Sequence, residues 1–429
     1  MAAELLREND KEMVIQITIP KSGDFMECEE LIQKALNEGG CLATQKCLEE
    51  FDTDGSPIQI GSEVLTAKRE KVSKKYETPY GAIAVERYSY QNSRGGQVYI
   101  PLNNSARIIG ATTPRFARIV SYNYSHNNAG VTQSNLAQTT CREVSKCYIQ
   151  DIAEHVAAHV EAKNRYWDYA ESEPDPAMVA YISIGIDGTT MLFCEEGYRQ
   201  AMVGTIAFFD ALGERLHTTY IAASPEYGKE TFFTRMDEEI QRVKDVYVGV
   251  RYVGITDGAT DFRPWLETHT TTRILDFWHV TEYINEAAGA IHRNKGPRKT
   301  WIDDTCHALK HEHGAARRIL DEFIAASGNE KLSKKIRKKV EAAISYFENN
   351  LDRMNYASYR KSHLPIGSGV TEAACKTVVK LRMCGSGMSW KKIGSDAVLT
   401  LRALALTQSR WAEFWQNTAK FSLTGSISP

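Results

Sequence analysis

The sequence predicts a mixed α/β protein whose central sheet is followed by a helical insertion. Three observations predict this class. Over residues 178–279, hydrophobic runs of strand length and two helical stretches follow one another in the order β-β-β-α-β-α-β. Residues 280–363 are helical in character throughout. A loop rich in Pro and Gly then leads into a further helix near residue 370.

Length and composition set the frame for this assignment. The 429 residues are enough for two or three domains, and 42% hydrophobic with 25% charged residues is typical of a globular protein. No apolar run approaches the roughly 20 residues needed to span a bilayer, and the first ten residues do not resemble a signal peptide. The nine cysteines are scattered without a C-x-x-C pair, which favours reduced thiols in a cytoplasm and disfavours a disulfide framework.

The net charge of -2 conceals an uneven distribution along the chain. Residues 1–60 are acidic, whereas residues 291–340 and 360–392 are basic. A basic run is most often a solvated helix face, but two such runs in one chain favour a polyanionic partner, for which nucleic acid is one candidate. The residues that we expect to contact DNA are Lys334, Lys335, Arg337, Lys338, Lys339, Lys376, Lys380 and Arg382.

The N-terminal part reads as a small DNA-binding region. Within residues 1–110 the pattern predicts two short helices over residues 25–51, separated at Gly39–Gly40, and then a β-hairpin that turns around residues 93–96. Residues 111–170 are helical from Pro114 onward, with a break near Thr139–Thr140. That arrangement is compatible with a helix-turn-helix, although any small helical bundle would look the same. The acidic, Pro-containing segment 171–177 is the clearest linker.

The core is predicted in two parts, residues 178–279 and 364–429, separated by the all-α insertion 280–363. In the first strand, "AYISIGIDG", Ile182, Ile184 and Ile186 share one face and Asp187 lies on the other. The remaining elements are predicted as strands at 200–210, 216–224, 246–256 and 272–277 and as helices at 228–244 and 261–268. Three hairpin-linked strands followed by α/β crossovers is the order of the ribonuclease H fold, which by itself fixes no function.

Two Asp-Gly pairs mark a candidate metal site. Asp187 is predicted to end the first strand and Asp257 the fourth, and in this strand order the two strands are neighbours. Glu372, in the first turn of the helix after the insertion, can complete a triad of carboxylates. Oxygen donors from three elements suit Mg²⁺, for which Mn²⁺ can substitute, and two such ions promote phosphoryl transfer. A single Asp-Gly pair at a strand end is usually a turn, but its joint occurrence favours the metal site.

Further residues lie close to this site along the predicted elements. Lys376 and Lys380 follow Glu372 at helical spacing, which places cations where a DNA phosphate would approach, although a solvated face would look the same. Asp276 and His279 follow the fifth strand, and we expect His279 to act in catalysis with Asp276 fixing its tautomer. The alternative is a buried His279 that holds the inserted helices against the sheet. A zinc site at Cys306, His307, His311 and His313 is less favoured because their spacing is irregular.

Several motifs together resemble a known family. "GIDGTTM", "GITDGA", "LDFWHVTEY" and "PIGSGVTEAACKTVVKLRMCGSGMSW" are similar to segments of the DDE transposases of bacterial insertion sequences. The likeness is to the Mutator-like branch, which has a helical insertion before the final glutamate, and it extends over residues 180–416. It implies that Asp187, Asp257 and Glu372 form the DDE triad and that Asp276 and His279 match the [C/D]-x-x-H signature.

The expected function is therefore that of a DNA transposase. Such a protein would bind the ends of its insertion sequence as a homodimer or higher oligomer on DNA in the bacterial cytoplasm. With Mg²⁺ it would cleave a phosphodiester and transfer the strand to target DNA. One alternative is a domesticated DNA-binding regulator that keeps the fold without cutting. Another is a nuclease that acts on RNA or RNA–DNA hybrids, which would use the same site.

Overall fold

The structure is a computed structural model that describes residues 3–164, 166–167, 169, 173–258 and 262–420. The chain forms two compact units. The first comprises residues 1–171 together with 391–405 and 409–429, and the second comprises residues 172–390 and 406–408. The segment predicted as a linker, residues 171–177, contains this boundary, although Glu171 and Ser172 lie outside the described residues. Each unit is described separately below.

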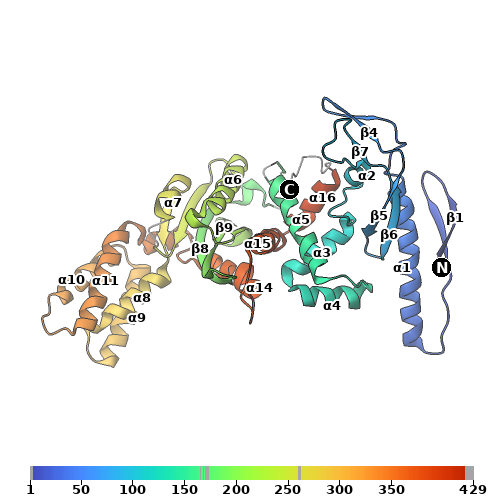
Figure 1. Ribbon diagram of the computed structural model, residues 1–429. Helices are drawn as coiled ribbons and strands as arrows, with labels where there is room; N and C mark the ends of the chain where they lie inside the picture. Colours follow the sequence, from blue (N-terminus) through green and yellow to red (C-terminus); the bar gives the residue numbers. More distant parts are fainter. Residues whose placement is uncertain (1–2, 165, 168, 170–172, 259–261, 421–429) are drawn as a thin grey trace. The chain divides into compact units, whose positions relative to one another are not determined.

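The second unit is built on a mixed five-stranded sheet (Figure 1). Its strands lie in the order β10-β9-β8-β11-β12, with the first three antiparallel and β11 parallel to both β8 and β12. This arrangement confirms the predicted order of elements and the predicted adjacency of the first and fourth strands. The strands are β8 (Tyr181–Phe193), β9 (Gly197–Phe209), β10 (Arg215–Ala223), β11 (Arg251–Thr256) and β12 (Thr272–Leu275).

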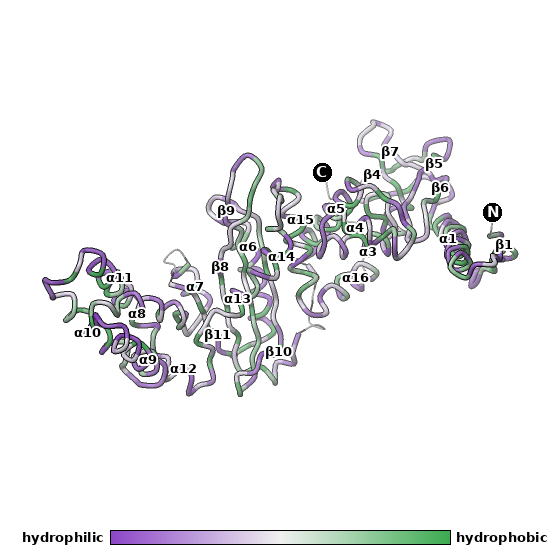
Figure 2. The backbone as a smooth tube through the Cα atoms, turned by 90° about the horizontal axis from the view of Figure 1, so that it is seen from below, coloured by the Kyte–Doolittle hydropathy of each residue, from purple (hydrophilic) through white to green (hydrophobic). Residues whose placement is uncertain are grey.

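One face of the sheet is covered by α6 (Glu230–Val246) and α7 (Arg263–His269) (Figure 1). Because side chains alternate along a strand, Ile182, Ile184 and Ile186 all point into this layer, as the sequence predicts. Hydrophobic stretches run along the strands of the sheet (Figure 2). Two short 3₁₀ helices precede β8 and α6, at Pro176–Met178 and Tyr227–Lys229.

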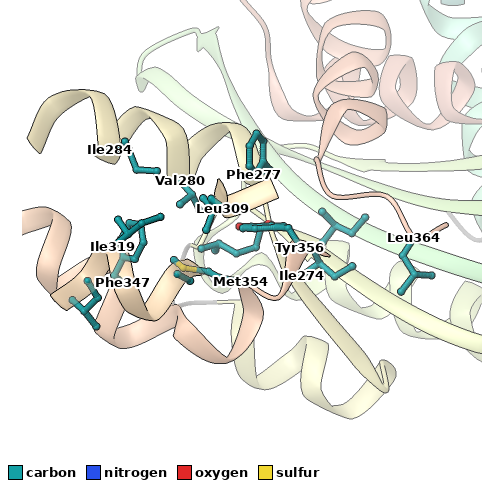
Figure 3. Close-up of a cluster of buried hydrophobic side chains, with 14 of the residues drawn as sticks. Ile274, Phe277, Val280, Ile284, Leu309, Ile319, Phe347, Met354, Tyr356 and Leu364 are labelled. Atoms are coloured by element: carbon teal, nitrogen blue, oxygen red, sulfur yellow. The ribbon is translucent and has the colours of Figure 1, made fainter. Parts of the chain in front are cut away.

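The helical insertion joins the sheet at the edge formed by β12 (Figure 1). It consists of α8 (Phe277–Ile291), α9 (Lys295–His311), α10 (Ala315–Ser327), α11 (Lys334–Asn350), a 3₁₀ turn (Leu351–Arg353) and α12 (Tyr356–Lys361). Val280 and Ile284 of α8, Leu309, Ile319 and Phe347 form a core that continues to Ile274 of β12 (Figure 3). The insertion therefore has its own apolar interior and a fixed attachment to the edge of the sheet.

The chain returns to the sheet through one continuous helical segment. It begins as α13 (Gly369–Ala374), widens into a π-helix over Cys375–Lys380 and ends as α14 (Leu381–Met383). Trp390 then pairs with the end of β8, where it forms a bridge to Phe193. Glu372 lies in the first turn of α13, as predicted.

The first unit combines small sheets with helices. Its strands are β1 (Ala3–Glu8) paired with β2 (Met13–Ile17), β5 (Val72–Glu77) paired with β6 (Ala82–Arg87), and a three-stranded sheet of β3 (Ile58–Ile60), β4 (Glu63–Ala67) and β7 (Tyr90–Gln91). The hairpin predicted around residues 93–96 is present only as a bridge between Tyr90 and Tyr99. The helices are α1 (Phe25–Glu49), α2 (Pro101–Ser105), α3 (Pro114–His126), α4 (Ala129–Thr140), α5 (Lys146–Asn164), α15 (Lys392–Leu406) and α16 (Arg410–Lys420).

The prediction of two short helices over residues 25–51 is wrong, because α1 runs without a break through Gly39 and Gly40. Both glycines are in close contact with large side chains. A Cβ at Gly39 would lie 2.6 Å from Ile17 Cδ1, and one at Gly40 would lie 2.4 Å from the Tyr80 ring. These glycines therefore allow close packing of α1 on its neighbours and do not end a helix.

Two strand boundaries also differ from the prediction. β8 continues past Asp187 to Phe193 in an antiparallel ladder with β9, so Asp187 does not end the strand. β11 begins only at Arg251, because residues up to Val246 complete α6. None of the helices that the structure describes has both the length and the apolar character needed to cross a membrane.

Candidate active site

The two aspartates are brought level by the register of β8 and β11. Ile255 pairs with Gly185 in the parallel ladder, so Asp257 and Asp187 each lie two residues beyond this pair, and the charge of Asp257 acts on Asp187. Residues paired in a parallel ladder point to the same side of the sheet. β11 ends at Thr256 while β8 continues, so Asp187 lies where the parallel ladder ends.

The helix that carries Glu372 lies against this same side of β8. Thr371 Oγ1 is 2.7 Å from Thr205 Oγ1 of β9, and both side chains are buried. A Cβ at Gly185 would lie only 2.0 Å from Thr371 Oγ1. Gly185 therefore permits a close approach of α13 to the sheet that no other residue would allow.

Asp187 is half-buried and is held by two donors. The backbone N–H of Gly188 lies 2.6 Å from its Oδ1, and the Cys375 Sγ lies 3.4 Å from its Oδ2. Burial raises the pKa of Asp187 above its usual range, and the negative charges of Asp257 and Glu372 raise it further. Asp257 and Glu372 are thus both close enough to Asp187 to act on it electrostatically.

A surface pocket contains two of the three carboxylates. It is lined by Asp187, Gly188, Thr189, Glu372, Cys375, Lys376, Lys380 and Leu381. The two lysines are exposed, and they share the pocket with Glu372 even though residues 375–380 form a π-helix with a wider turn than an α-helix. Single π-helical turns occur frequently at functional sites.

The donor set fits a hard divalent cation. All three acidic side chains offer oxygen ligands, and among the described residues no ion pair joins Asp187 to a lysine or arginine. In the described part of the chain, no three His, Cys, Asp or Glu side chains gather closely enough to form a ready-made metal cluster. A cation bound here would therefore have to draw the carboxylates together. The same finding applies to the less favoured zinc site, where His307 stacks on His311.

Asp276 differs in role from the prediction. It is fully buried and caps the N-terminus of α8, where its Oδ1 accepts the backbone N–H groups of Trp278 and His279. The prediction that Asp276 fixes the tautomer of His279 is therefore wrong for this structure, since the contact is to the backbone of His279. The His279 ring is 38% exposed and its Nδ1 lies 3.4 Å from Glu282 Oε2.

The other carboxylate oxygen of Asp276 faces the loop before α13. Its Oδ2 accepts both the backbone N–H and the hydroxyl of Ser368, each at 2.5 Å. Ser368 Oγ also lies 2.6 Å from Glu372 Oε1. Asp276 and Glu372 are thus linked through a single side chain.

The predicted DNA-contacting residues of the insertion fall into two groups. Lys334, Lys335 and Lys338 are exposed on α11. Arg337 instead donates to the carbonyls of Ser327 and Asn329 at the end of α10, and Lys339 lies 3.7 Å from Glu286. The exposed Lys334, Lys335 and Lys338 are therefore better placed to meet a DNA phosphate than Arg337 and Lys339, which contact other parts of the insertion.

Arg382 is not placed to contact DNA. Its side chain is 3% exposed and its guanidinium lies over the Trp390 ring, 5.2 Å from the centroid. Stacking on an aromatic face suits a guanidinium that is removed from water. Lys376 and Lys380, by contrast, reach the pocket beside Asp187.

Three residues that touch the site were not predicted to belong to it. Ser368 and Cys375 contact Glu372 and Asp187, and the Tyr346 hydroxyl donates to the backbone carbonyl of Asp257 at 2.9 Å. Ser368 and Cys375 lie within four residues of Glu372 on its helix, so proximity in sequence was an available signal. Tyr346 comes from α11 and carries no such signal.

No model of a known protein family matches the chain, and no curated protein matches it either.

Proposed function

We propose that the protein is a DNA transposase that cleaves the ends of an insertion sequence and joins them to target DNA. In this proposal the five-stranded sheet and its helices form a ribonuclease H-like core, and Asp187, Asp257 and Glu372 hold Mg²⁺. The observation that carries the proposal is that Asp187 and Asp257 follow the last pair of the β8–β11 ladder by two residues each, with the helix of Glu372 against the same side of β8. Mutual electrostatic repulsion at Asp187 supports it.

The residues of the chain would divide the work by their chemistry. A divalent cation, when bound, would supply a nucleophile and neutralise charge on the reacting phosphate. The three carboxylates would hold it from β8, β11 and α13. Lys376 and Lys380, exposed in the same pocket, would attract and orient the DNA backbone. Lys334, Lys335 and Lys338 on α11 would extend this contact along the duplex.

The proposal is tested by substituting each carboxylate separately. Asp187→Ala, Asp257→Ala and Glu372→Ala should each reduce Mg²⁺-dependent cleavage to background, because metal ligands act in the transition state. The substrate is a plasmid that carries the DNA flanking the reading frame. Binding of that DNA, measured by mobility shift, should change only a few-fold.

Asp304→Ala is a matched control, because Asp304 is an exposed carboxylate of α9 outside the site. It should cleave like the wild type. Wild-type protein that binds the flanking DNA but does not cut it with Mg²⁺ or Mn²⁺ would instead support the non-cleaving regulator. Preferential cleavage of an RNA–DNA hybrid in competition would support the nuclease.

A further inference from the structure

We infer that Asp276 is a positioning residue for Glu372 and acts on it through Ser368. This inference rests on the proposed function of the site, because it concerns how Glu372 is oriented toward a metal. Asp276 directly follows β12 and precedes α8. Ser368 comes after the insertion and precedes α13. The three side chains form a linked series, here called the Ser368 bridge, that consists of Asp276, Ser368 and Glu372.

The buried end of the bridge is rigid. Asp276 is 0% exposed, and each of its carboxylate oxygens has two donors within hydrogen-bond distance. A further backbone bond, from Phe277 N–H to the Ile366 carbonyl at 2.8 Å, fixes the same two segments to each other. The loop that precedes α13 is therefore tied to the start of α8.

Glu372 is the exposed end of the bridge, and its side chain is the one that a hydrogen bond from Ser368 would orient. Glu372 is exposed on a helix of six residues, so its long side chain has considerable rotamer freedom. Of the two carboxylate oxygens of Glu372, Oε1 is the one within hydrogen-bond distance of Ser368 Oγ, and Oε2 can turn toward a metal. Hydrogen bonds to the second oxygen of a ligating carboxylate commonly orient it and tune its affinity.

The allocation of hydrogens explains why Asp276 matters to Glu372. Ser368 has one hydroxyl hydrogen and lies near two carboxylates. Its backbone N–H gives Asp276 Oδ2 a donor that no other group competes for. The one hydroxyl hydrogen can bond only one of the two carboxylates at a time, and when it turns to Glu372 the backbone N–H still holds Ser368 on Asp276. The fixed position of Ser368 therefore determines where Glu372 Oε1 is held.

Two variants separate this role from capping and folding. Asp276→Asn keeps a side-chain oxygen for the N-cap of α8, but its amide N–H₂ faces the backbone N–H of Ser368, so two donors oppose each other. Ser368→Ala removes only the hydroxyl and leaves the backbone bond to Asp276. Ser368→Thr restores a hydroxyl and serves as the conservative control.

Full-length protein is assayed in two ways, by cleavage of the flanking-DNA plasmid over a range of Mn²⁺ concentrations and by Mn²⁺ binding in electron paramagnetic resonance. A positioning role predicts that Ser368→Ala and Asp276→Asn raise the half-saturating Mn²⁺ concentration about 10–100-fold in both measurements. Cleavage should recover at high Mn²⁺, and Ser368→Thr should remain near the wild type.

Unchanged Mn²⁺ dependence of both variants would overturn the inference while leaving the proposed function intact. A loss of the saturating rate with unchanged Mn²⁺ binding would also overturn it, because that result would make Asp276 a participant in the reaction. Wild-type protein that neither binds Mn²⁺ nor cleaves DNA would overturn the proposed function, and this inference with it.

Discussion

Gly185 controls how closely the helix bearing Glu372 approaches the aspartates. The space that a Cβ would need at this position is taken by Thr371 Oγ1 and, at 3.0 Å, by Thr205 Oγ1. The two hydroxyls bond to each other, so neither can move without loss of a buried hydrogen bond. At the scale of single residues, the geometry of the site thus depends on a missing side chain as much as on the carboxylates.

We expect Gly185→Ala to lower the free energy of unfolding by about 1–3 kcal/mol, the usual cost of overpacking a filled core. It should also lower Mg²⁺-dependent cleavage, because α13 must shift away from β8. Gly369→Ala is the control, since a Cβ there meets nothing within 4 Å. Chemical denaturation of both variants checks the prediction, and equal stability of the two would contradict it.

His279 allows a separate test of its role, because its ring is partly exposed and its Nδ1 lies 3.4 Å from the exposed Glu282. His279→Ala should therefore leave the melting temperature close to that of the wild type. Should His279 act in the reaction, cleavage would fall by about 10²–10⁴-fold at unchanged stability. A reduced melting temperature with a normal cleavage rate would show that the residue is structural.

At the scale of elements, α11 combines two kinds of basic residue. Lys334, Lys335 and Lys338 project from its first turns into solvent, whereas Arg337 caps the end of α10 through two carbonyls. A basic run in a sequence therefore does not identify which of its members are available to DNA, because that depends on the contacts each side chain makes in the folded protein.

Replacing Lys334, Lys335 and Lys338 by Gln should weaken DNA binding for all sequences alike. The slope of log K against log salt should become shallower by roughly 0.9 for each phosphate contact that is lost. Arg337→Ala is the matched comparison and should lower stability with little change in that slope. Mobility-shift titrations at several salt concentrations measure both, and an unchanged slope for the triple variant would mean that these lysines form a solvated face.

Elements with strong periodicity could be predicted from the sequence, and elements set by packing could not. Ile182, Ile184 and Ile186 alternate with small or polar residues, so both the strand and the side on which Asp187 lies follow from the pattern. Gly39 and Gly40 carry the usual signal of a helix break, but α1 continues because Ile17 and Tyr80 fill the space beside them. Tertiary contacts decide such positions.

The site shows the same division. The nearness of Asp187 and Asp257 could be predicted from strand order, because β8 and β11 are neighbouring parallel strands, although β8 continues past Asp187. The Ser368 bridge could not be predicted, because it joins residues 276 and 368 across the whole insertion. The local pattern predicts the helices of the insertion but not how they pack. Arg382 was misjudged because a charge in a sequence does not reveal burial under Trp390.

At the scale of the whole molecule, the C-terminal helix α15 belongs to the first unit. Arg402 donates to the Ser125 carbonyl of α3, and Thr400 donates to Glu161 of α5. The range 364–429, predicted as one part of the core, is thus divided after Trp390. The core of the first unit therefore cannot be complete until α15 has been synthesised.

We expect Leu401→Asp to unfold the first unit selectively, because Leu401 is fully buried on α15 and an unpaired buried charge costs several kcal/mol. Ile393→Asp on the same helix is the control, since Ile393 is 71% exposed. Hydrogen exchange should show lost protection over residues 3–164 and retained protection in β8 to β12. Equal loss in both units would contradict the assignment of α15.

The insertion between Asp257 and Glu372 also has a consequence during protein synthesis. The 115 positions that separate these residues require roughly 6–23 seconds of translation at the usual rate of about 5–20 residues per second. During this interval the nascent chain contains Asp187 and Asp257 but not Glu372. In the proposed function, the metal site would therefore stay incomplete until the helix that carries Glu372 has been synthesised.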